Sequence, residues 1–327
     1  MYSLNNQLKD KVTGLNDLLK GKYESVLGLG KDELRKFINE NIGEIKTLEK
    51  LDRAHLAIHE AKGGIVGVDG SNNKLGGSYP HFVEVYQALA KSTVNQEDPL
   101  ILADIYSPLY IEKENNLLEE DHEIMDKTNI KLSTIEVEVA LESIDKFKPY
   151  AILMDGGLIR YNIYANEKWL ELKEKCEDKG ILLVGVIEDI KTSMIGDKLK
   201  NIDPNIKEVF YDRELLFGQL DYGEVIMIKD EVNKKEPEGY SSIFLRSSLD
   251  PSVIGMDIID SQKEYMEEMA RLVFTLTPEN SRGVPLWLDI IDEEVNISDD
   301  IMKALMERYM DRGVYERFFI PERDKRN

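Results

Sequence analysis

Two short apolar runs of this sequence end in the same dipeptide, Asp-Gly, and this repetition is its most constraining feature. The first run, "GIVGVDGSNN", reaches Asp69, and the second, "YAILMDGG", reaches Asp155. Asp-Gly between apolar runs is also the commonest short hairpin signal, so a hairpin at Asp69 is the alternative. If the two runs are neighbouring parallel strands, both carboxylates emerge at the carboxyl edge of one sheet, where open α/β folds place their sites.

The segments around these runs alternate between strand-like and helix-like patterns, which predicts an α/β fold. The runs "HFVEVYQALA" and "PLILADIY" follow the first Asp-Gly strand and predict an antiparallel meander with it. Residues 131–147 fit both a strand and a helix, and their length favours a helix. Further strands are predicted for "ILLVGVIE", "EVIMI" and "SSIFLRS", and further helices for 167–179, "QKEYMEEMARLVFTL" and "SDDIMKALMERYM".

The first 60 residues differ from the rest of the chain in the spacing of their apolar residues. They carry helical spacing interrupted by "LGLGK", which predicts two helices around a connector. No internal repeat or flexible linker follows. We therefore expect an N-terminal helical segment over residues 1–60 and a single α/β domain over residues 61–327.

Composition restricts the partners and the compartment. The formal net charge of −21 repels a polyanion at long range, which counts against unaided binding of nucleic acid. The one cysteine, Cys176, excludes an intramolecular disulfide and a cysteine-based zinc cluster. The sequence has no signal-peptide pattern and no apolar stretch near the ~20 residues that span a bilayer, so we expect a cytoplasmic protein with no membrane partner.

A third acid can reach the two aspartates from the helix before Asp155. From Glu138 to Phe147 a helix advances at ~1.5 Å per residue, and the strand from Tyr150 returns about the same distance at ~3.3 Å per residue. Glu138 and Asp155 would then lie at the same end of their elements. Converging carboxylates repel one another unless they share protons or hold a cation, and oxygen ligands favour Mg²⁺ or Mn²⁺ over zinc. The alternatives are turn-forming aspartates and an exposed helix glutamate.

Three blocks together resemble the NurA nuclease family. They are "GIVGVDGSNN", the acidic helix "IEVEVALE" seventeen residues before "ILMDGGL", and the strand-then-lysine segment "VGVIEDIKTS". Their order is that of the family, and the resemblance covers roughly residues 60–300. It implies a ribonuclease H-like mixed sheet flanked by helices, here with an N-terminal helical extension.

The resemblance also implies an activity. The family's members are Mn²⁺- or Mg²⁺-dependent nucleases that act on DNA ends with a hexameric HerA-type ATPase as translocase. The implied function is a 5′-to-3′ exonuclease, with single-strand endonuclease activity as a further expectation, in DNA end resection and repair. A homodimer is implied as well. By position, Asp69, Glu138 and Asp155 would be the metal ligands.

The chain departs from the family in one late motif. The family has Gly-Tyr-Pro, with a histidine eight residues after the tyrosine, whereas this chain has "RGVPLWLDIIDEE". Val284 takes the tyrosine position and Asp292 takes the histidine position. Asp292 can still bind a hard cation through oxygen, while the lost tyrosine removes a contact to substrate or water.

The expected mechanism is hydrolysis with two cations, in which one activates water and the other stabilises the leaving oxygen. Lys191, in the turn after a strand, would neutralise the transition state, and Arg160, Arg246 and Arg282 are candidate phosphate contacts. Two alternatives remain open. One is an actin- or sugar-kinase-like phosphotransferase, and the other is a catalytically degenerate adaptor for the ATPase.

Overall fold

The computed structural model describes residues 6–28, 30–95, 98–110, 121–202, 206 and 208–320. Within them a single mixed sheet of nine strands runs in the order β1-β7-β8-β9-β6-β5-β2-β3-β4. The strands are β1 (Gly43–Thr47), β2 (Ile65–Gly76), β3 (Phe82–Ser92), β4 (Leu100–Tyr106), β5 (Ala151–Asp155), β6 (Leu182–Ile187), β7 (Glu224–Ile228), β8 (Tyr240–Leu245) and β9 (Ile254–Ile259).

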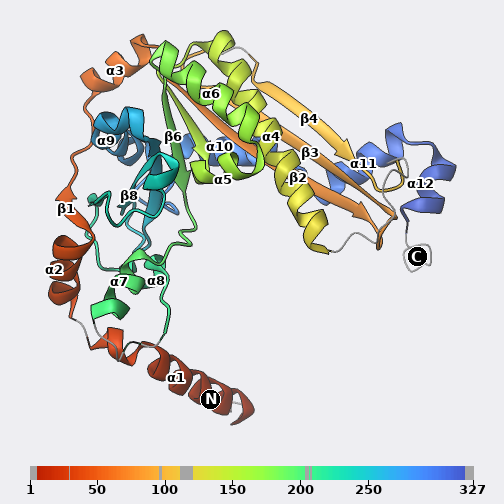
Figure 1. Ribbon diagram of the computed structural model, residues 1–327. Coiled ribbons are helices and arrows are strands. Elements are labelled where there is room, and N and C mark those ends of the chain that lie inside the picture. The colour runs from red at the N-terminus through yellow and green to blue at the C-terminus, as the bar shows by residue number, and fades with distance from the viewer. Residues whose placement is uncertain are drawn as a thin grey trace.

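Helices cover the sheet on both faces, which confirms the predicted α/β class (Figure 1). The α-helices are α1 (Asn6–Leu27), α2 (Lys31–Asn41), α3 (Arg53–Ala61), α4 (Asp121–Phe147), α5 (Leu158–Tyr164), α6 (Asn166–Lys179), α7 (Met194–Ile202), α8 (Asp212–Leu216), α9 (Met266–Leu276), α10 (Leu286–Val295), α11 (Asp299–Tyr309) and α12 (Arg312–Phe318). None of the described helices is both long enough and apolar enough to cross a membrane.

Strand β2 continues through Asp69 and Gly70, so the hairpin alternative at this dipeptide is wrong. Asp69 lies opposite Leu89 in the antiparallel pair with β3, and the pairing extends to Gly76 and Phe82. The chain reverses only after Gly76. Strand β3 then pairs with β4, also antiparallel, which confirms the predicted meander.

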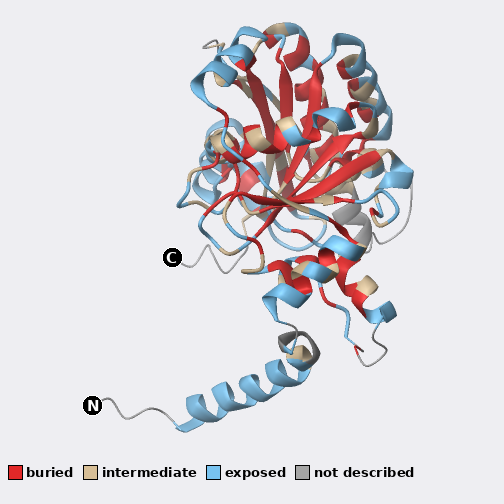
Figure 2. Ribbon diagram, turned by 90° about the vertical axis from the view of Figure 1, so that its left-hand side faces the viewer, coloured by how far each residue is buried: buried red, intermediate tan, exposed pale blue. Residues whose placement is uncertain are grey.

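The middle of the sheet is parallel. Strand β5 pairs in parallel with β2 on one side and with β6 on the other. Residues 151–154 of β5 and 182–186 of β6 are buried on both faces, which explains why their sequences are continuous apolar runs (Figure 2). The two Asp-Gly strands are therefore parallel neighbours, which is the condition for their carboxylates to meet.

Two apolar clusters sandwich these central strands. On one face Val68 and Met154 pack with residues of α4, α5 and α6. On the other face Leu153 and Val186 pack with residues of α9 and with Leu288 of α10. The middle of β2, around Asp69, and the carboxyl end of β5 thus lie between α4 on one face and α10 on the other.

The N-terminal region contains the two predicted helices, α1 and α2, together with α3 and a strand. Strand β1 pairs antiparallel with β7, and Ile38 of α2 packs in a cluster with residues of α7 and α8. Helix α1 extends away from the body, and its residues 6–21 are exposed (Figure 2). Strand β1 departs from the all-helical expectation, and the boundary near residue 60 stays a prediction.

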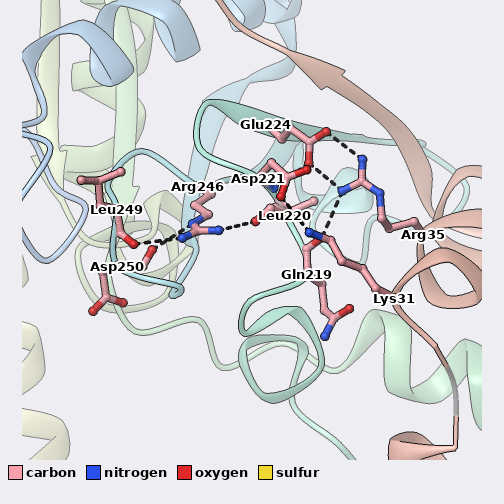
Figure 3. A network of polar contacts seen from close by, with 9 residues as sticks. All are labelled: Lys31, Arg35, Gln219, Leu220, Asp221, Glu224, Arg246, Leu249 and Asp250. Atoms are coloured by element: carbon pink, nitrogen blue, oxygen red, sulfur yellow. Dashed lines mark hydrogen bonds and ion pairs between the residues drawn. The ribbon is translucent and has the colours of Figure 1, made fainter.

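A polar network fastens α2 to the loop before β7 (Figure 3). Arg35 makes two hydrogen bonds to the carboxylate of Glu224, at 2.6 and 2.7 Å. Lys31 contacts Asp221 at 2.7 Å, and the Asp221 amide donates to Glu224 at 2.6 Å. A bidentate arginine–carboxylate pair has defined geometry as well as charge, so this network holds α2 in a fixed position on the domain.

Candidate active site

Asp69, within β2, and Asp155, at the carboxyl end of β5, are neighbours in the sheet. The parallel register pairs Val68 with Met154, which brings the next residue of each strand side by side. Asp69 is only 8% exposed, and its Oδ1 accepts a hydrogen bond of 2.7 Å from the amide of Gly70. The sheet therefore places two carboxyl groups together in a mostly buried position.

A third carboxyl group comes from Glu136 on α4, which is 1% exposed. It packs directly against the backbone of β2, since a methyl group built on Gly70 would lie 2.5 Å from Glu136 Oε1 and 2.9 Å from Leu132 Cδ1. Because Gly70 has no side chain, Glu136 has room beside it. The glycine of the Asp-Gly pair serves the packing of the helix rather than a turn.

This position differs from the one the sequence argument assigned. Glu138 is two residues further along α4, about 200° around the helix axis from Glu136 at ~100° per residue. Glu136 shares a face with the apolar residues Leu132 and Ala140, whereas Glu138 shares one with exposed Glu142. Distance along a helix sets the height of a side chain, but rotation about the axis sets its direction. Glu136, not Glu138, is therefore the acid of α4 that lies beside Asp69.

Asp292 and Arg282 approach the same place from α10 and the loop before it. The Arg282 guanidinium donates to Asp289 at 2.9 Å and to Glu188 at 2.6 Å, and it lies 3.5 Å from Asp292. Its charge lowers the pKa of Asp155, whereas the charge of Asp292 raises it. The structure thus brings both residues predicted from this segment to the two aspartates.

Arg160 balances the buried charge of Glu136. Its guanidinium donates to Glu136 and, at 3.1 Å, to the hydroxyl of Tyr161. Its Nε is buried and has no hydrogen-bond partner in the described part of the chain. Arg160 and Arg282 are thus the two of the three predicted phosphate-contacting arginines that lie at the site. Arg160 also retains an unused donor.

The carboxyl groups of this cluster hold protons more tightly than usual. Burial raises the pKa of Asp69 to about 8, and the charges of Asp155 and Glu136 add to this effect. Burial likewise raises the pKa of Asp155 to about 6, against the opposing charges of Arg282 and Arg160. Burial also raises the pKa of Glu136, and the ion pair with Arg160 opposes it. Negative charge in this cluster is in excess of the basic groups that face it.

Three other residues singled out in the sequence, Lys191, Arg246 and Val284, are not part of the group of acids. The Lys191 side chain is 78% exposed, follows β6 and lies 3.8 Å from Asp189. Arg246 donates to the main-chain carbonyls of Leu220, Leu249 and Asp250 (Figure 3), which favours a structural role over a phosphate contact. Val284 is 2% exposed and belongs to the core. No side chain from that position reaches the acids in place of the family's tyrosine.

The donor set suits a hard divalent cation. Asp69 and Asp155 offer oxygen ligands, and their raised pKa values are those expected of carboxyl groups that lack a nearby cation. The Arg160 guanidinium donates to Oε2 of Glu136, which leaves Oε1 for a cation. In the described ranges no group of three His, Cys, Asp or Glu side chains is arranged to hold a metal ion.

Comparison with known proteins gives one family and one fold. The NurA domain family matches residues 63–297. The NurA nuclease from Sulfolobus solfataricus has a similar structure, with 14% identity, coverage of 93% of this chain and 96% of that chain, and a TM-score of 0.55. Endonuclease V from Bacillus subtilis is a weaker match, with 12% identity, coverage of 85% and 92%, and a TM-score of 0.40. No curated protein sequence matches this chain. The expected ribonuclease H-like mixed sheet is thereby confirmed.

Proposed function

This chain belongs to the NurA family, and on that basis we propose that it is a divalent-metal-dependent DNA nuclease. The observation that carries the proposal is the meeting of Asp69, Asp155 and Glu136, from two adjacent strands and one helix, at one buried position in the sheet. Clusters of carboxyl groups with raised pKa values are a feature of functional sites. The similar protein from Sulfolobus solfataricus is itself a nuclease.

Each residue has a definable role in phosphodiester hydrolysis. Asp69 and Asp155 would hold Mn²⁺ or Mg²⁺, with Glu136 and Asp292 on either side of them. When bound, two such ions polarise the phosphodiester and lower the pKa of the attacking water. Arg282 would contact the phosphate from the α10 side and Arg160 from the α4 side. Lys191, whose exposed side chain lies 3.8 Å from Asp189, would approach the leaving oxygen.

For the direction of cleavage and the biological process, the proposal follows the family. We expect a 5′-to-3′ exonuclease, with single-strand endonuclease activity, that functions in DNA end resection and repair. The net charge of −21 opposes capture of DNA by this chain alone. A HerA-type hexameric ATPase that delivers the strand would remove this obstacle, and we therefore include it as a partner.

Helix α1 supports the expected homodimer. Its exposed apolar residues Leu8, Val12, Leu15 and Leu19 recur at intervals of four and three. This spacing produces the apolar seam of a coiled coil, which is stable only against a partner helix. The equivalent helix of a second copy offers the same seam.

The alternatives predict different outcomes. A degenerate adaptor is motivated by Val284, whose buried side chain cannot replace a tyrosine at the site, but Asp292 supplies a carboxylate in the position of the family's histidine. A phosphotransferase would release phosphate from ATP rather than nucleotides from DNA. The NurA match favours the nuclease over this second alternative.

The deciding experiment follows nucleotide release from end-labelled linear DNA with Mn²⁺, Mg²⁺ or chelator, for the native chain and for Asp69→Asn. We expect metal-dependent release by the native chain and its loss in the variant. Absence of cleavage by the native chain, even with its ATPase partner, would reject the nuclease and favour the adaptor.

A further inference from the structure

A pocket of about 400 Å³ lies beside the carboxyl cluster, on the side of the sheet covered by α5 and α7. Its volume is within the ~300–1,000 Å³ range of pockets that bind small molecules. Arg160 belongs to both places, since its side chain lines the pocket and its guanidinium contacts Glu136. Gly156, which directly follows Asp155, also lines the pocket. A molecule inside would therefore share Arg160 with the carboxyl cluster.

The floor of the pocket is one face of the sheet. Phe244 of β8 pairs with Gly255 of β9, and Gly255 pairs in turn with Ile187 of β6. All three line the pocket. A methyl group built on Gly255 would lie 3.4 Å from Ile187 Cβ, at ordinary contact distance. The missing side chain at Gly255 thus deepens an apolar floor bounded by an aromatic ring and an isoleucine.

The walls of the pocket are fixed and polar. Lys235 contacts both carboxylate oxygens of buried Asp257 at 2.7 Å. Asp257 also accepts a hydrogen bond of 2.7 Å from Ser242 Oγ and one of 3.3 Å from the amide of Leu158. A buried ion pair with its hydrogen bonds satisfied adds rigidity without unpaired charge. This wall is preformed and needs no ligand to complete it.

Each basic residue at the rim of the pocket has a carboxylate partner, which is Asp189 for Lys191 and Asp197 for Lys234. Four basic residues line the pocket (Arg160, Lys191, Lys234 and Lys235) against two acidic ones (Asp189 and Asp257). Lys191 and Lys234 are exposed. An apolar slot with cations at its mouth suits a flat, apolar-faced molecule that carries an anionic group.

We propose that this pocket holds the base of the nucleotide next to the bond that is cut, with its phosphate directed to Lys191 and Lys234. The proposal rests on the proposed function and extends it, because it makes one nucleotide leave the base stack to enter the site. The base packs on the floor at Gly255 and Phe244, and π-faces of all four bases suit such a surface. A free nucleotide has the same base and phosphate as a nucleotide within DNA. Two assays therefore distinguish a free nucleotide from DNA as the occupant of the pocket.

The first assay measures binding of deoxyadenosine 5′-monophosphate to the full chain by calorimetry in the presence of chelator. We expect binding, at least tenfold weaker binding of base-free deoxyribose 5-phosphate, and at least tenfold weaker binding of the nucleotide by Gly255→Val. Lys191→Met should weaken binding, whereas Lys200→Met, a matched exposed lysine on α7, should not. Thermal unfolding checks that each variant is folded, and Gly255→Ala serves as the smaller filling if the valine disrupts the sheet.

Two results of this assay would overturn the proposal. One is equal binding of the nucleotide by the native chain and by a folded Gly255 variant. The other is equal binding of the nucleotide and the base-free phosphate, because the pocket would then recognise the anion alone.

The second assay uses end-labelled DNA whose residue next to the cut is either normal or abasic. The native chain should cut the normal DNA at least tenfold faster, and Gly255→Val should cut both at the same low rate. Nucleotide binding without this discrimination would assign the pocket to free nucleotide and contradict the proposal. If the native chain cuts neither DNA with Mn²⁺ or Mg²⁺, the nuclease assignment fails, while the calorimetry still decides whether the pocket takes a nucleotide.

Discussion

Arg160 donates to the buried carboxylate of Glu136, and this ion pair joins the helix after β5 to the helix before it. The negative charge of Glu136 is therefore compensated from within the chain, while Asp69 and Asp155 lack an equally close basic partner. A cation bound by the two aspartates would compensate their negative charge. The site thus has three carboxylates, one of which is paired with Arg160, while the charge of Arg282 acts on Asp155.

Removal of Arg160 should destabilise the fold. Loss of one partner of a buried ion pair costs ~3–5 kcal/mol, because the other charge stays buried and unpaired. Arg160 is itself partly exposed, so we expect Arg160→Met to fall at or below the lower end of that range. The double variant Arg160→Met/Glu136→Gln should recover most of the loss. Urea unfolding of the four proteins with chelator present measures this, and strictly additive effects would contradict the pairing.

The stability of the metal-free chain should fall as pH rises. Asp69 has a pKa of about 8 in the folded chain against an ordinary value of 3.8, so the folded state binds more protons between these values. Unfolding therefore becomes easier as pH increases through this window. In Asp69→Asn this contribution is absent. Melting temperatures with chelator should diverge in favour of the variant from pH 5 to pH 8, and parallel curves would contradict the raised pKa.

Gly70 should be needed for activity, although it has no side chain. A Cβ at this position would meet Glu136 Oε1 at 2.5 Å, so Gly70→Ala should displace the glutamate from the aspartates. Gly77, just beyond the same strand, has only one atom within 4 Å of such a Cβ, at 4.0 Å, and serves as the control. We expect at least tenfold slower DNA cleavage for Gly70→Ala and little change for Gly77→Ala. Equal rates would show that Glu136 need not occupy this position.

The oligomeric state should depend on the seam of α1. Leu15 lies on this seam, whereas Leu18 is 73% exposed and lies off it. A charge in the seam of a coiled coil is buried without a partner, so Leu15→Glu should convert the proposed homodimer to monomer. Leu18→Glu should remain dimeric. Light scattering gives both masses, and a Leu15→Glu dimer would place the dimer contact elsewhere.

Much of the fold could be predicted from local patterns. The parallel strands β5 and β6 are buried on both faces and have continuous apolar sequences. The segment that forms α4 fits both a strand and a helix pattern, and its length identified it as a helix. Strand β1 was missed because "GEIKT" has little apolar content and is held by its pairing with β7. Such a strand depends on a partner more than 170 residues away in sequence, which no local pattern reveals.

The site was predictable in part. Asp69 and Asp155 follow from the two Asp-Gly dipeptides after apolar runs, although β2 continues beyond Asp69 to Gly76, whereas Glu136 requires the phase of the helix. Its signal was present, since Glu136 interrupts the apolar stripe of α4, which is unusual for a carboxylate. The pocket was not predictable, because its floor depends on pairing among β6, β8 and β9.

A comparison of Glu136→Gln with Glu138→Gln in Mn²⁺-dependent cleavage of end-labelled DNA decides which glutamate of α4 belongs to the site. The two changes are chemically identical and lie two residues apart on α4, so each controls for the other. We predict that Glu136→Gln loses cleavage by at least a hundredfold while Glu138→Gln keeps nearly the native rate. The reverse result would return the third carboxylate to Glu138 and contradict the site described for this chain.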